Sequence, residues 1–314
     1  MVRIGLIGTL EQSVPHAEIL AKVPGVEITG YFNPAADFSM AGSANGSIRK
    51  FVSFEDFLLQ VDAIDFVCRS QSCFDIASQA LKRTKHLFIS TSILKNRQQA
   101  HELINLANEA NVTLMVERPV RYHAALNAIL PQIKDLRLIE IHNQFSDEND
   151  NSYESIFRAI MTDVEIIHTV LHANVKNLKA CGIKMVNGNP DVINIRLEFD
   201  NACVANLNCS RITSENSHYG LFTQQDRITK VDFLTNEITV IKPEKNNKSA
   251  SNNYAMQPVT RKVIPNNPMF DELINFIYSI INNSKLLSRP EDGFRSLYLA
   301  EKIMDSLNRI SVSH

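Results

Sequence analysis

Apolar runs and stretches of helical spacing alternate along residues 1–122. Short apolar runs with β-branched members indicate buried strands at residues 2–7, 26–32, 63–68, 86–90 and 112–116. Apolar residues at helical spacing predict helices between them, at residues 14–23, 54–59, 74–83 and 97–110. Apolar strands that alternate with helices are typical of a parallel sheet covered on both faces. Because crossovers between parallel strands are right-handed, we expect a Rossmann-type doubly wound domain here.

Residues 123–314 show a different pattern, in which strands follow one another without helices between them. After a helix at 123–134, strands are predicted at residues 137–145, 176–186, 192–199, 202–211, 218–223, 228–234 and 237–242. A second helix, 154–171, interrupts the series after its first strand. Asn201 stands where a tight hairpin is favoured. This order predicts a second, α+β domain with a mostly antiparallel open sheet.

The end of the chain carries a polar stretch and two helices. Residues 244–256 are polar and asparagine-rich, which predicts a loop. Helices are expected at 269–282 and 291–309, the last packing back on the first domain. The apolar residues of the strands at 192–231 alternate between the two faces of the sheet. We therefore expect both faces to be largely buried, one of them in a homodimer or tetramer built through this sheet.

Composition narrows the class of protein. The 314 residues carry 32 basic and 34 acidic side chains, a formal net charge of -2, which gives no electrostatic reason to expect nucleic acid or an anionic membrane as partner. The odd number of cysteines, five, and the absence of C-x-x-C spacing favour free thiols over disulfides or a metal site. Neither a signal peptide nor a run of about 20 apolar residues is found, so a cytoplasmic protein is expected.

The first predicted strand runs into a degenerate dinucleotide fingerprint. A G-x-G-x-x-G motif that starts at Gly8 would have glycines where Leu10 and Ser13 stand. Leu10 places a side chain where the pyrophosphate normally meets the backbone, although the amides around Thr9 at the helix start remain. Either a working cofactor site or a retained turn without one fits this motif.

The second predicted strand ends at Asn33, where an NAD-binding domain usually has an acidic residue for the ribose hydroxyls. Asn33 can accept a hydrogen bond, but as a neutral and weaker acceptor. Because Pro34 follows, the same residue also suits an ordinary loop opening. Binding of NAD or NADP is therefore expected to be weak or absent.

The chain resembles the glucose–fructose oxidoreductase / inositol dehydrogenase / MocA family of nicotinamide-dependent sugar oxidoreductases. The stretches that carry the resemblance are Asp62–Val67, Phe74–Leu81, Lys85–Ile89, Arg196–Phe199, Cys203–Leu207 and Glu291–Leu297. They cover both predicted domains in the right order. The resemblance implies a cofactor-binding role for Ser90 and for Ser70, the latter after the strand at 63–68.

The family's active-site motifs are altered at the matching positions. The resemblance implies a Glu-Lys-Pro motif where this chain has Ser90, Thr91 and Ser92, so the family's lysine is replaced by Thr91. Thr91 carries no cation and cannot act as an ammonium acid does. Glu117-Arg118-Pro119 looks like a conservative form of that motif, but it comes one helix and one strand too late, and a coincidence is the favoured interpretation.

On the helix at 154–171, the family has an Asp, a His four residues later and an Asp three residues after that. The matching residues here are Arg158, Thr162 and Glu165. The family's acid–base histidine is thus replaced by Thr162. His168 lies nearly two turns further on and is a fallback base, although a packed or surface histidine is the commoner case.

Three hypotheses for function remain open. The chain is a divergent relative that binds a nucleotide or a sugar-like ligand with lost or altered hydride transfer, or an active oxidoreductase with relocated groups (Glu117, Arg118 or His168), or a non-catalytic structural or regulatory subunit. A substrate pocket, if retained, is expected near Arg121, Tyr122 and Glu165, where the family's cleft opens. Losing the glycines, the ribose acid, the lysine and the histidine together favours the first or the third.

Overall fold

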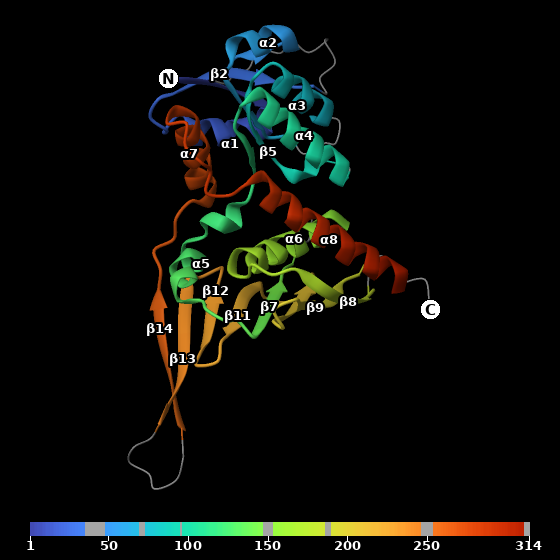
Figure 1. Cartoon of the computed structure of the whole chain (residues 1–314), viewed down its shortest axis with the longest axis vertical. Helices are drawn as coiled ribbons and strands as arrows, with labels where there is room; N and C mark the ends of the chain where they lie inside the picture. Colours follow the sequence, from blue (N-terminus) through green and yellow to red (C-terminus); the bar gives the residue numbers. More distant parts are fainter. Residues whose placement is uncertain are drawn as a thin grey trace. The chain divides into compact units, whose positions relative to one another are not determined.

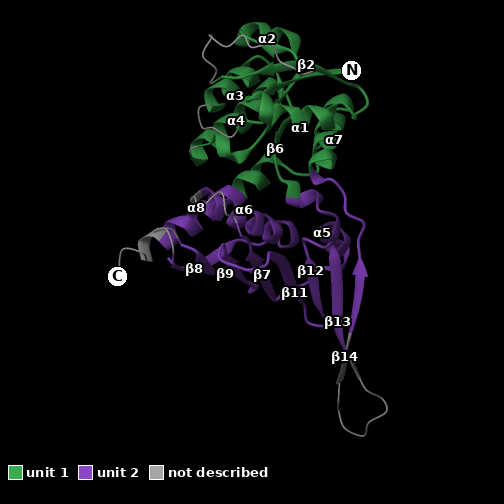
Figure 2. Ribbon diagram, turned by 180° about the vertical axis from the view of Figure 1, so that it is seen from behind, with its two compact units in different colours: residues 1–119, 269–295 green, residues 120–268, 296–314 purple. Residues whose placement is uncertain are grey.

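The computed structural model describes residues 1–34, 48–68, 73–94, 96–146, 153–185, 190–245 and 254–310. The chain divides into two compact units (Figure 2): unit 1 holds Met1–Pro119 and Met269–Arg295, and unit 2 holds Val120–Pro268 and Ser296–His314. The sequence predicted a division into residues 1–122 and 123–314. The units differ from this because the segment 269–295 belongs to unit 1.

Unit 1 contains a six-stranded parallel sheet in the order β3-β2-β1-β4-β5-β6. Its strands are β1 (Val2–Ile7), β2 (Val26–Phe32), β3 (Lys50–Phe51), β4 (Ala63–Phe66), β5 (His86–Ile89) and β6 (Leu114–Val116). Its first helices are α1 (Leu10–Leu20), α2 (Phe54–Gln60), α3 (Cys73–Lys82) and α4 (Arg97–Ala110). Helices α3 and α4 lie side by side on one face of the sheet and α1 lies on the other (Figure 1). The predicted doubly wound Rossmann domain is confirmed.

Local sequence explains where these helices begin and end. Ser53 and Asn96 accept hydrogen bonds from backbone N–H groups in the first turns of α2 and α4, as N-caps do. Asn111 ends α4 in the left-handed conformation that asparagine tolerates. Every residue of β4 is buried, in keeping with a central strand covered on both faces.

Helix α7 (Pro268–Ile281) is the late segment that packs on the core of unit 1. The Phe276 ring lies against Phe88 of β5, with 5.8 Å between ring centroids. Helix α8 (Pro290–Ile310) starts in unit 1, but Leu299, Ala300, Ile303, Met304 and Leu307 belong to the core of unit 2. The first turns of α8 lie on unit 1, where Gly293 comes close to Val116 of β6, and α7 is a second late helix that packs there. Both helices have an apolar stripe, and periodicity alone does not say which sheet a stripe covers.

Unit 2 is built on an eight-stranded sheet in the order β14-β13-β12-β11-β7-β10-β9-β8. Its strands are β7 (Leu138–Gln144), β8 (Val175–Ile183), β9 (Val192–Phe199), β10 (Val204–Ser210), β11 (Ser217–Thr223), β12 (Ile228–Asp232), β13 (Glu237–Lys245) and β14 (Tyr254–Lys262). All neighbours pair antiparallel except β7 and β10. Helices α5 (Ala124–Ile129), α6 (Tyr153–Val170) and α8 contribute to the core on one face (Figure 1). The predicted mostly antiparallel sheet is confirmed.

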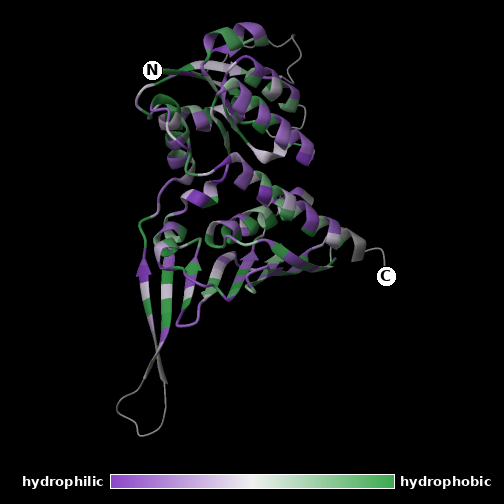
Figure 3. Cartoon of the chain, viewed as in Figure 1, coloured by the Kyte–Doolittle hydropathy of each residue, from purple (hydrophilic) through white to green (hydrophobic). Residues whose placement is uncertain are grey.

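The two faces of this sheet differ in polarity. Figure 3 shows hydrophobic and hydrophilic residues alternating along its strands. On the inner face Ile193, Ile195, Leu197, Ala205, Leu207 and Val231 are at most 1% exposed. On the outer face Asn194, Arg196 and Glu198 alternate with them, and Ile228 is exposed. The outer face therefore carries mainly polar side chains, and its burial in a homodimer or tetramer stays a prediction.

Two strands escaped the sequence analysis. β3 has only two residues, and β14 overlaps the polar stretch that was predicted to be a loop. The part of that stretch at residues 246–253 lies outside the described residues. The described portion of β14 from Pro258 to Lys262 is exposed, and the strand pairs only with β13, at the edge of the sheet. An edge strand with little burial leaves no apolar alternation to detect.

Candidate functional site

The carboxyl edge of the parallel sheet in unit 1 brings together the residues that the sequence marked for cofactor binding. Gly8, Thr9 and Leu10 follow β1, Asn33 follows β2, and Ser90 and Thr91 follow β5. Strand order reverses direction between β1 and β4, and in open α/β sheets ligands bind at such a point. Ser70 lies outside the described residues.

Gly8 occupies a position that only glycine fits. Its φ is +157°, and a Cβ atom there would come within 2.6 Å of Val67 Cγ2 and 3.1 Å of the Cys68 backbone nitrogen. The segment at Val67 and Cys68 approaches so closely that the first position of the fingerprint requires glycine. Ser13 stands at the third glycine position, is fully buried, and donates from Oγ to the Thr9 carbonyl over 2.8 Å. A small residue thus preserves the tight packing of helix on strand.

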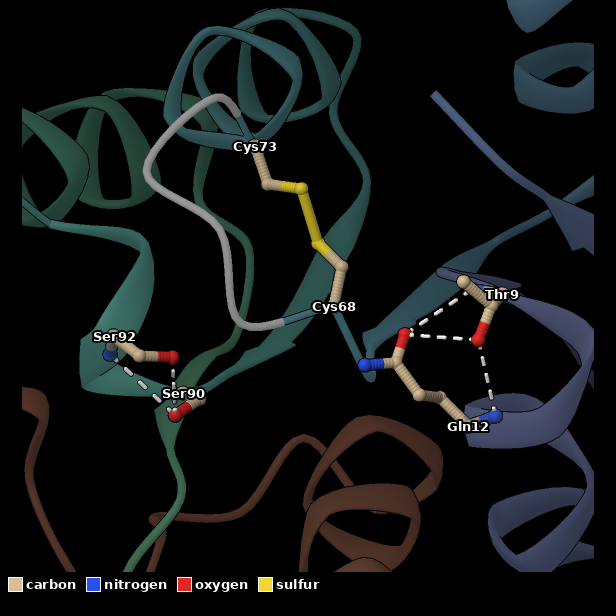
Figure 4. The surroundings of a disulfide bond; sticks show 6 residues. All are labelled: Thr9, Gln12, Cys68, Cys73, Ser90 and Ser92. Atoms are coloured by element: carbon tan, nitrogen blue, oxygen red, sulfur yellow. Dashed lines mark hydrogen bonds between the residues drawn. A yellow bond between two sulfur atoms is a disulfide. The ribbon is translucent and has the colours of Figure 1, made fainter. Parts of the chain in front are cut away.

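The start of α1 uses some of its own amides. Thr9 is the N-cap, and its Oγ1 accepts from the Gln12 N–H at 3.3 Å (Figure 4). The Gln12 side chain accepts in turn from the Thr9 N–H at 3.2 Å, which completes a capping box. Leu10 and Glu11 are the first two residues of the helix, and Glu11 is exposed. A pyrophosphate at this helix start would meet the Leu10 side chain, the capping box and a carboxylate.

The position of the family's lysine lies in a short 3-10 helix, Thr91–Ile93. Ser90 caps it, and its Oγ accepts from the Ser92 N–H at 3.5 Å and the Ser92 hydroxyl at 3.1 Å (Figure 4). Thr91 is partly exposed. The segment after β5 thus offers hydroxyl groups and no cation among Ser90, Thr91 and Ser92.

Cys68 and Cys73 form a disulfide beside this edge (Figure 4). Cys68 comes two residues after β4, and Cys73 opens α3. The expectation of five free thiols is wrong for this pair, because the ends of β4 and α3 bring together two cysteines whose spacing matches no common motif. Cys181, Cys203 and Cys209 are free.

Glu117 and Arg118, the candidates for relocated catalytic groups in unit 1, follow β6. Arg118 is 4% exposed, and its Nη1 donates to Ser288 Oγ over 2.8 Å. The Arg118 backbone N–H donates to Glu272 of α7. Glu117 is partly buried, and its N–H donates to the Ile89 carbonyl. The Arg118 side chain is therefore engaged in joining segments within unit 1.

In unit 2, a cavity of about 260 Å³ adjoins helix α6. Its lining includes Arg158 and Thr162, two of the three positions that match the family's helical motif. Thr162 Oγ1 donates to the Arg158 carbonyl at 3.0 Å, and Arg158 itself is exposed. The third position, Glu165, is 5% exposed and is not part of the described lining.

The other predicted residues of unit 2 make contacts away from the described lining of this cavity. His168 is 7% exposed, with Nδ1 2.9 Å from Ser296 Oγ of α8. Arg121 donates to Asn127 Oδ1 at 3.0 Å, and the Tyr122 carbonyl accepts from Asn266. These contacts join neighbouring segments of unit 2.

The sequence analysis missed a polar cluster on the inner face of the sheet. His218 of β11 and Asn143 of β7 are direct cross-strand partners and line the cavity together with Thr162. Asp163, the next residue on α6, is fully buried, and its Oδ1 lies 2.9 Å from His218 Nε2 and 3.1 Å from Asn143 Nδ2. Burial raises the pKa of Asp163, while the hydrogen bonds from His218 and Asn143 act in the opposite direction.

One signal in the sequence points to this cluster. In β7 the inward positions run Ile139, Ile141, Asn143, and in β11 they start at His218, so the alternation puts polar residues on the buried face. Buried polar groups need partners. The alternation shows that Asn143 and His218 face inward, but it does not show that Asp163 packs over them.

Within the described residues, no helix is both long and apolar enough to cross a membrane. Nor does any group of three or more His, Cys, Asp or Glu in the described part of the chain have a geometry that suits a metal ion.

Comparisons with known proteins agree with this architecture. Residues 2–118 match the family model GFO_IDH_MocA, an oxidoreductase family with an NAD-binding Rossmann fold. UDP-N-acetylglucosamine 3-dehydrogenase of Acidithiobacillus ferrooxidans is 24% identical over 245 residues, which cover 76% of each chain. A solved structure of that enzyme superposes with a TM-score of 0.86 at 21% identity and covers 99% of both chains.

A further solved structure has a known ligand set. An oxidoreductase from Agrobacterium radiobacter in complex with NAD+, L-tartaric acid and magnesium has a TM-score of 0.77 at 13% identity, and the match covers 97% of this chain and 96% of that one. At these identities the structural likeness establishes the fold alone.

Proposed function

The chain belongs to the glucose–fructose oxidoreductase / inositol dehydrogenase / MocA family, and from this premise we propose that it binds a nicotinamide nucleotide weakly, binds a sugar-like ligand, and has altered hydride-transfer chemistry. The proposal rests on the residues that this chain has at the positions of the two family motifs. Thr91 and Thr162 stand at the positions of the lysine and the histidine, while the first glycine, Gly8, is present and a cavity lies beside Thr162.

The residues at the edge of the unit 1 sheet can hold a nicotinamide dinucleotide, but with reduced affinity. Gly8 permits close approach, and the N–H groups of Leu10 and Glu11 are the helix donors that the capping box does not use. Against this stand the Leu10 side chain and the Glu11 carboxylate, which repels a pyrophosphate. Asn33 would face the ribose as a neutral acceptor, in place of a charge-assisted hydrogen bond worth roughly 1.5–3 kcal/mol.

The cavity in unit 2 supports a sugar-like ligand. Its volume of about 260 Å³ is slightly below the usual range for drug-sized ligands, roughly 300–1,000 Å³, and suits a single sugar ring. Asn143, Ser155 and Thr162 offer hydrogen-bonding groups, and Arg158 offers a cation for an anionic substituent. The relative from Acidithiobacillus makes amino-sugar nucleotides the first ligands to test.

Altered chemistry follows from the two threonines. Oxidation of an alcohol needs a group that accepts the hydroxyl proton, which typically contributes about 10²–10⁴-fold, and a cation that stabilises the developing alkoxide. Threonine hydroxyls supply neither near neutral pH. We therefore expect no turnover that depends on positions 91 and 162. Restoring Lys at 91 and His at 162 together should raise any dehydrogenase rate.

Titration of NADH and NADPH, followed by nicotinamide fluorescence, tests the cofactor proposal. The unchanged chain should bind no tighter than micromolar, and Leu10→Gly should bind more tightly. Glu11→Gln should also improve affinity by roughly two- to fivefold at low salt, since a charge in the first helical turn is worth about 0.3–1 kcal/mol. Glu18→Gln, on the exposed side of the same helix, is the matched control and should change nothing. A sub-micromolar dissociation constant for the unchanged chain would contradict the proposal.

A further inference from the structure

Three neighbouring strands of unit 2 present to helix α6 a row of side chains that consists of a thiol, an amide and an imidazole. The register pairs Cys209 of β10 with Asn143 of β7, and Asn143 with His218 of β11. Cys209 and Asn143 are buried, and His218 keeps 13% of its side chain exposed. The inward residues Leu207 of β10 and Ile141 of β7, which precede the row on their strands, are buried and apolar, so Asn143 and His218 mark where the cavity begins.

Asp163 covers this row. Its side chain is 1% exposed, and Oδ1 is held by both Asn143 and His218. Oδ2 has no hydrogen-bond partner among the described residues. A carboxyl group is costly to bury unless it is paired, so the sequence retains a charge-bearing group here at a cost that packing alone does not explain.

The contacts of His218 leave one ring nitrogen for a ligand. Nε2 faces Asp163, and the ring packs at 4.8 Å, centroid to centroid, from Phe233. Nδ1 makes no hydrogen bond to any described residue. When Nε2 carries the proton and donates it to Asp163, Nδ1 presents a lone pair, the arrangement of a carboxylate-oriented general base.

Other histidines of unit 2 are engaged elsewhere. His168 is bound to Ser296 and nearly buried. His142, on the outer face, stacks on Tyr219 with 4.8 Å between centroids. His123 has Nε2 3.1 Å from the Phe233 carbonyl oxygen. Of the histidines in the described part of the chain, His218 is the one that lines the cavity with Thr162.

We propose that His218, positioned by Asp163, is the proton-transfer group for a hydroxyl bound in this cavity, and so takes over the task of the histidine that Thr162 replaces. This inference rests on the proposed function, because a bound oxidised nicotinamide supplies the hydride acceptor. That acceptor would take the carbon-bound hydrogen of the ligand with its electron pair as the C–O bond becomes C=O. The hydroxyl proton passes to Nδ1, which converts the imidazole to imidazolium. In reduction, the same Nδ1–H returns the proton.

The pair makes the reaction dependent on pH. A base must be unprotonated to accept the hydroxyl proton, so oxidation should become faster as the pH rises. Other titratable groups near the pair are Cys209, His123 and Arg158. His218→Gln should remove this dependence, because glutamine does not titrate.

The test compares His218→Gln and Asp163→Asn with His142→Gln, a matched control from the outer face of the same sheet. UDP-N-acetylglucosamine, UDP-glucose, N-acetylglucosamine and myo-inositol are offered with NAD+ and NADP+ in the full chain. We expect turnover in the unchanged protein with at least one of them, a loss of about 10²–10⁴-fold in kcat for His218→Gln with little change in KM, and wild-type rates for His142→Gln. Thermal melts establish that each variant is folded.

Imidazole ¹⁵N NMR gives a readout that does not depend on turnover. In the unchanged protein, the His218 signals should show Nε2 protonated, and the ligand that turns over should shift them but not those of His142. Asp163→Asn should change this tautomer, because its amide can donate to Nε2 and leave the proton on Nδ1.

The outcomes separate this inference from the proposed function. Unchanged kcat in His218→Gln, or no turnover of any offered ligand although the nicotinamide nucleotide binds, overturns the role of His218 and leaves the binding proposal in place. Absence of any nucleotide binding overturns both.

Discussion

Thr162 stands where the family has its histidine, and a different histidine lies in the same cavity. Thr162 cannot exchange protons near neutral pH, yet it lines the same cavity as His218, which comes from a different element. The next residue, Asp163, makes the link, since it points into the core and holds the imidazole. Asp163, which follows the replaced position 162, is therefore as informative about the cavity as Thr162 itself.

The buried carboxyl of Asp163 should affect the pH dependence of folding. Burial raises its pKa in the folded protein, whereas an unfolded chain has an aspartate pKa near 3.9. The folded state therefore holds the proton more tightly, and this contribution to the free energy of unfolding is present at low pH and is lost as the pH rises through the folded value. Denaturant titrations at about pH 4 and about pH 7 should show the wild type losing stability relative to Asp163→Asn at the higher pH. An equal difference at both values would contradict the assignment.

The cysteines should fall into three classes of reactivity. Cys181 is exposed and should react fast with a thiol reagent in the native protein. Burial raises the pKa of Cys203 to about 11 and also raises the pKa of Cys209, so both should react slowly until the chain unfolds. Without reductant, denatured protein should show three thiols, and five after reduction, because Cys68 and Cys73 are bonded. Five thiols without reduction would exclude the disulfide.

Among the elements, the hairpin between β9 and β10 shows how turn chemistry fixes register. Asn201 Oδ1 accepts from the Cys203 N–H at 3.1 Å, and Ala202 adopts a φ of +64°. The tight turn predicted at Asn201 is confirmed, and it sets the pairing of Ala205 with Leu197 on the inner face. The left-handed conformation is strained for alanine.

Relief of this strain should stabilise the protein. Ala202 is exposed, so a substitution acts mainly through the backbone. Ala202→Gly should raise the free energy of unfolding by roughly 0.5–1 kcal/mol, the strain relieved less the added entropy of the unfolded chain. Ala202→Val should lower it, because β-branched residues fit this region poorly. Equilibrium denaturation of both variants measures the effect, and a change of the same sign in both would contradict the argument.

For the whole molecule, the outer face of the unit 2 sheet determines what kind of assembly is expected. That face carries a polar network in which Asn194 donates to Asn208 at 2.7 Å and Arg196 contacts Glu198 and Asn206. A self-associating sheet of this kind relies on hydrogen bonds and charge pairing more than on apolar burial, so its association should weaken with salt.

Light scattering tests the assembly. We expect a mass of two or four times the 35.4 kDa of one chain at micromolar concentration. Asn206→Arg should shift the mass toward the monomer by placing a second cation beside Arg196, whereas Asn105→Arg, at an exposed position of α4 in unit 1, should not. A monomer mass for the unchanged chain would contradict the predicted oligomer.

The sequence by itself determined the elements and the class of fold. Periods of 2 and 3.6 residues are local, so β9 and α4 begin and end where the pattern predicted. The loss of the fingerprint glycines and of the family's lysine and histidine was also readable, because those motifs occupy fixed positions along the chain.

Only the tertiary structure decided which side chains meet. His218 and Asp163 lie on different elements, Cys68 and Cys73 are bonded although one follows β4 and the other opens α3, and α8 divides its residues between the two units. Local patterns show which face of a helix or strand is apolar, but they do not show which other element that face packs against. The packing partner of each face is decided when the whole chain folds. The same packing buries Arg118 among structural contacts and places His218 at the cavity.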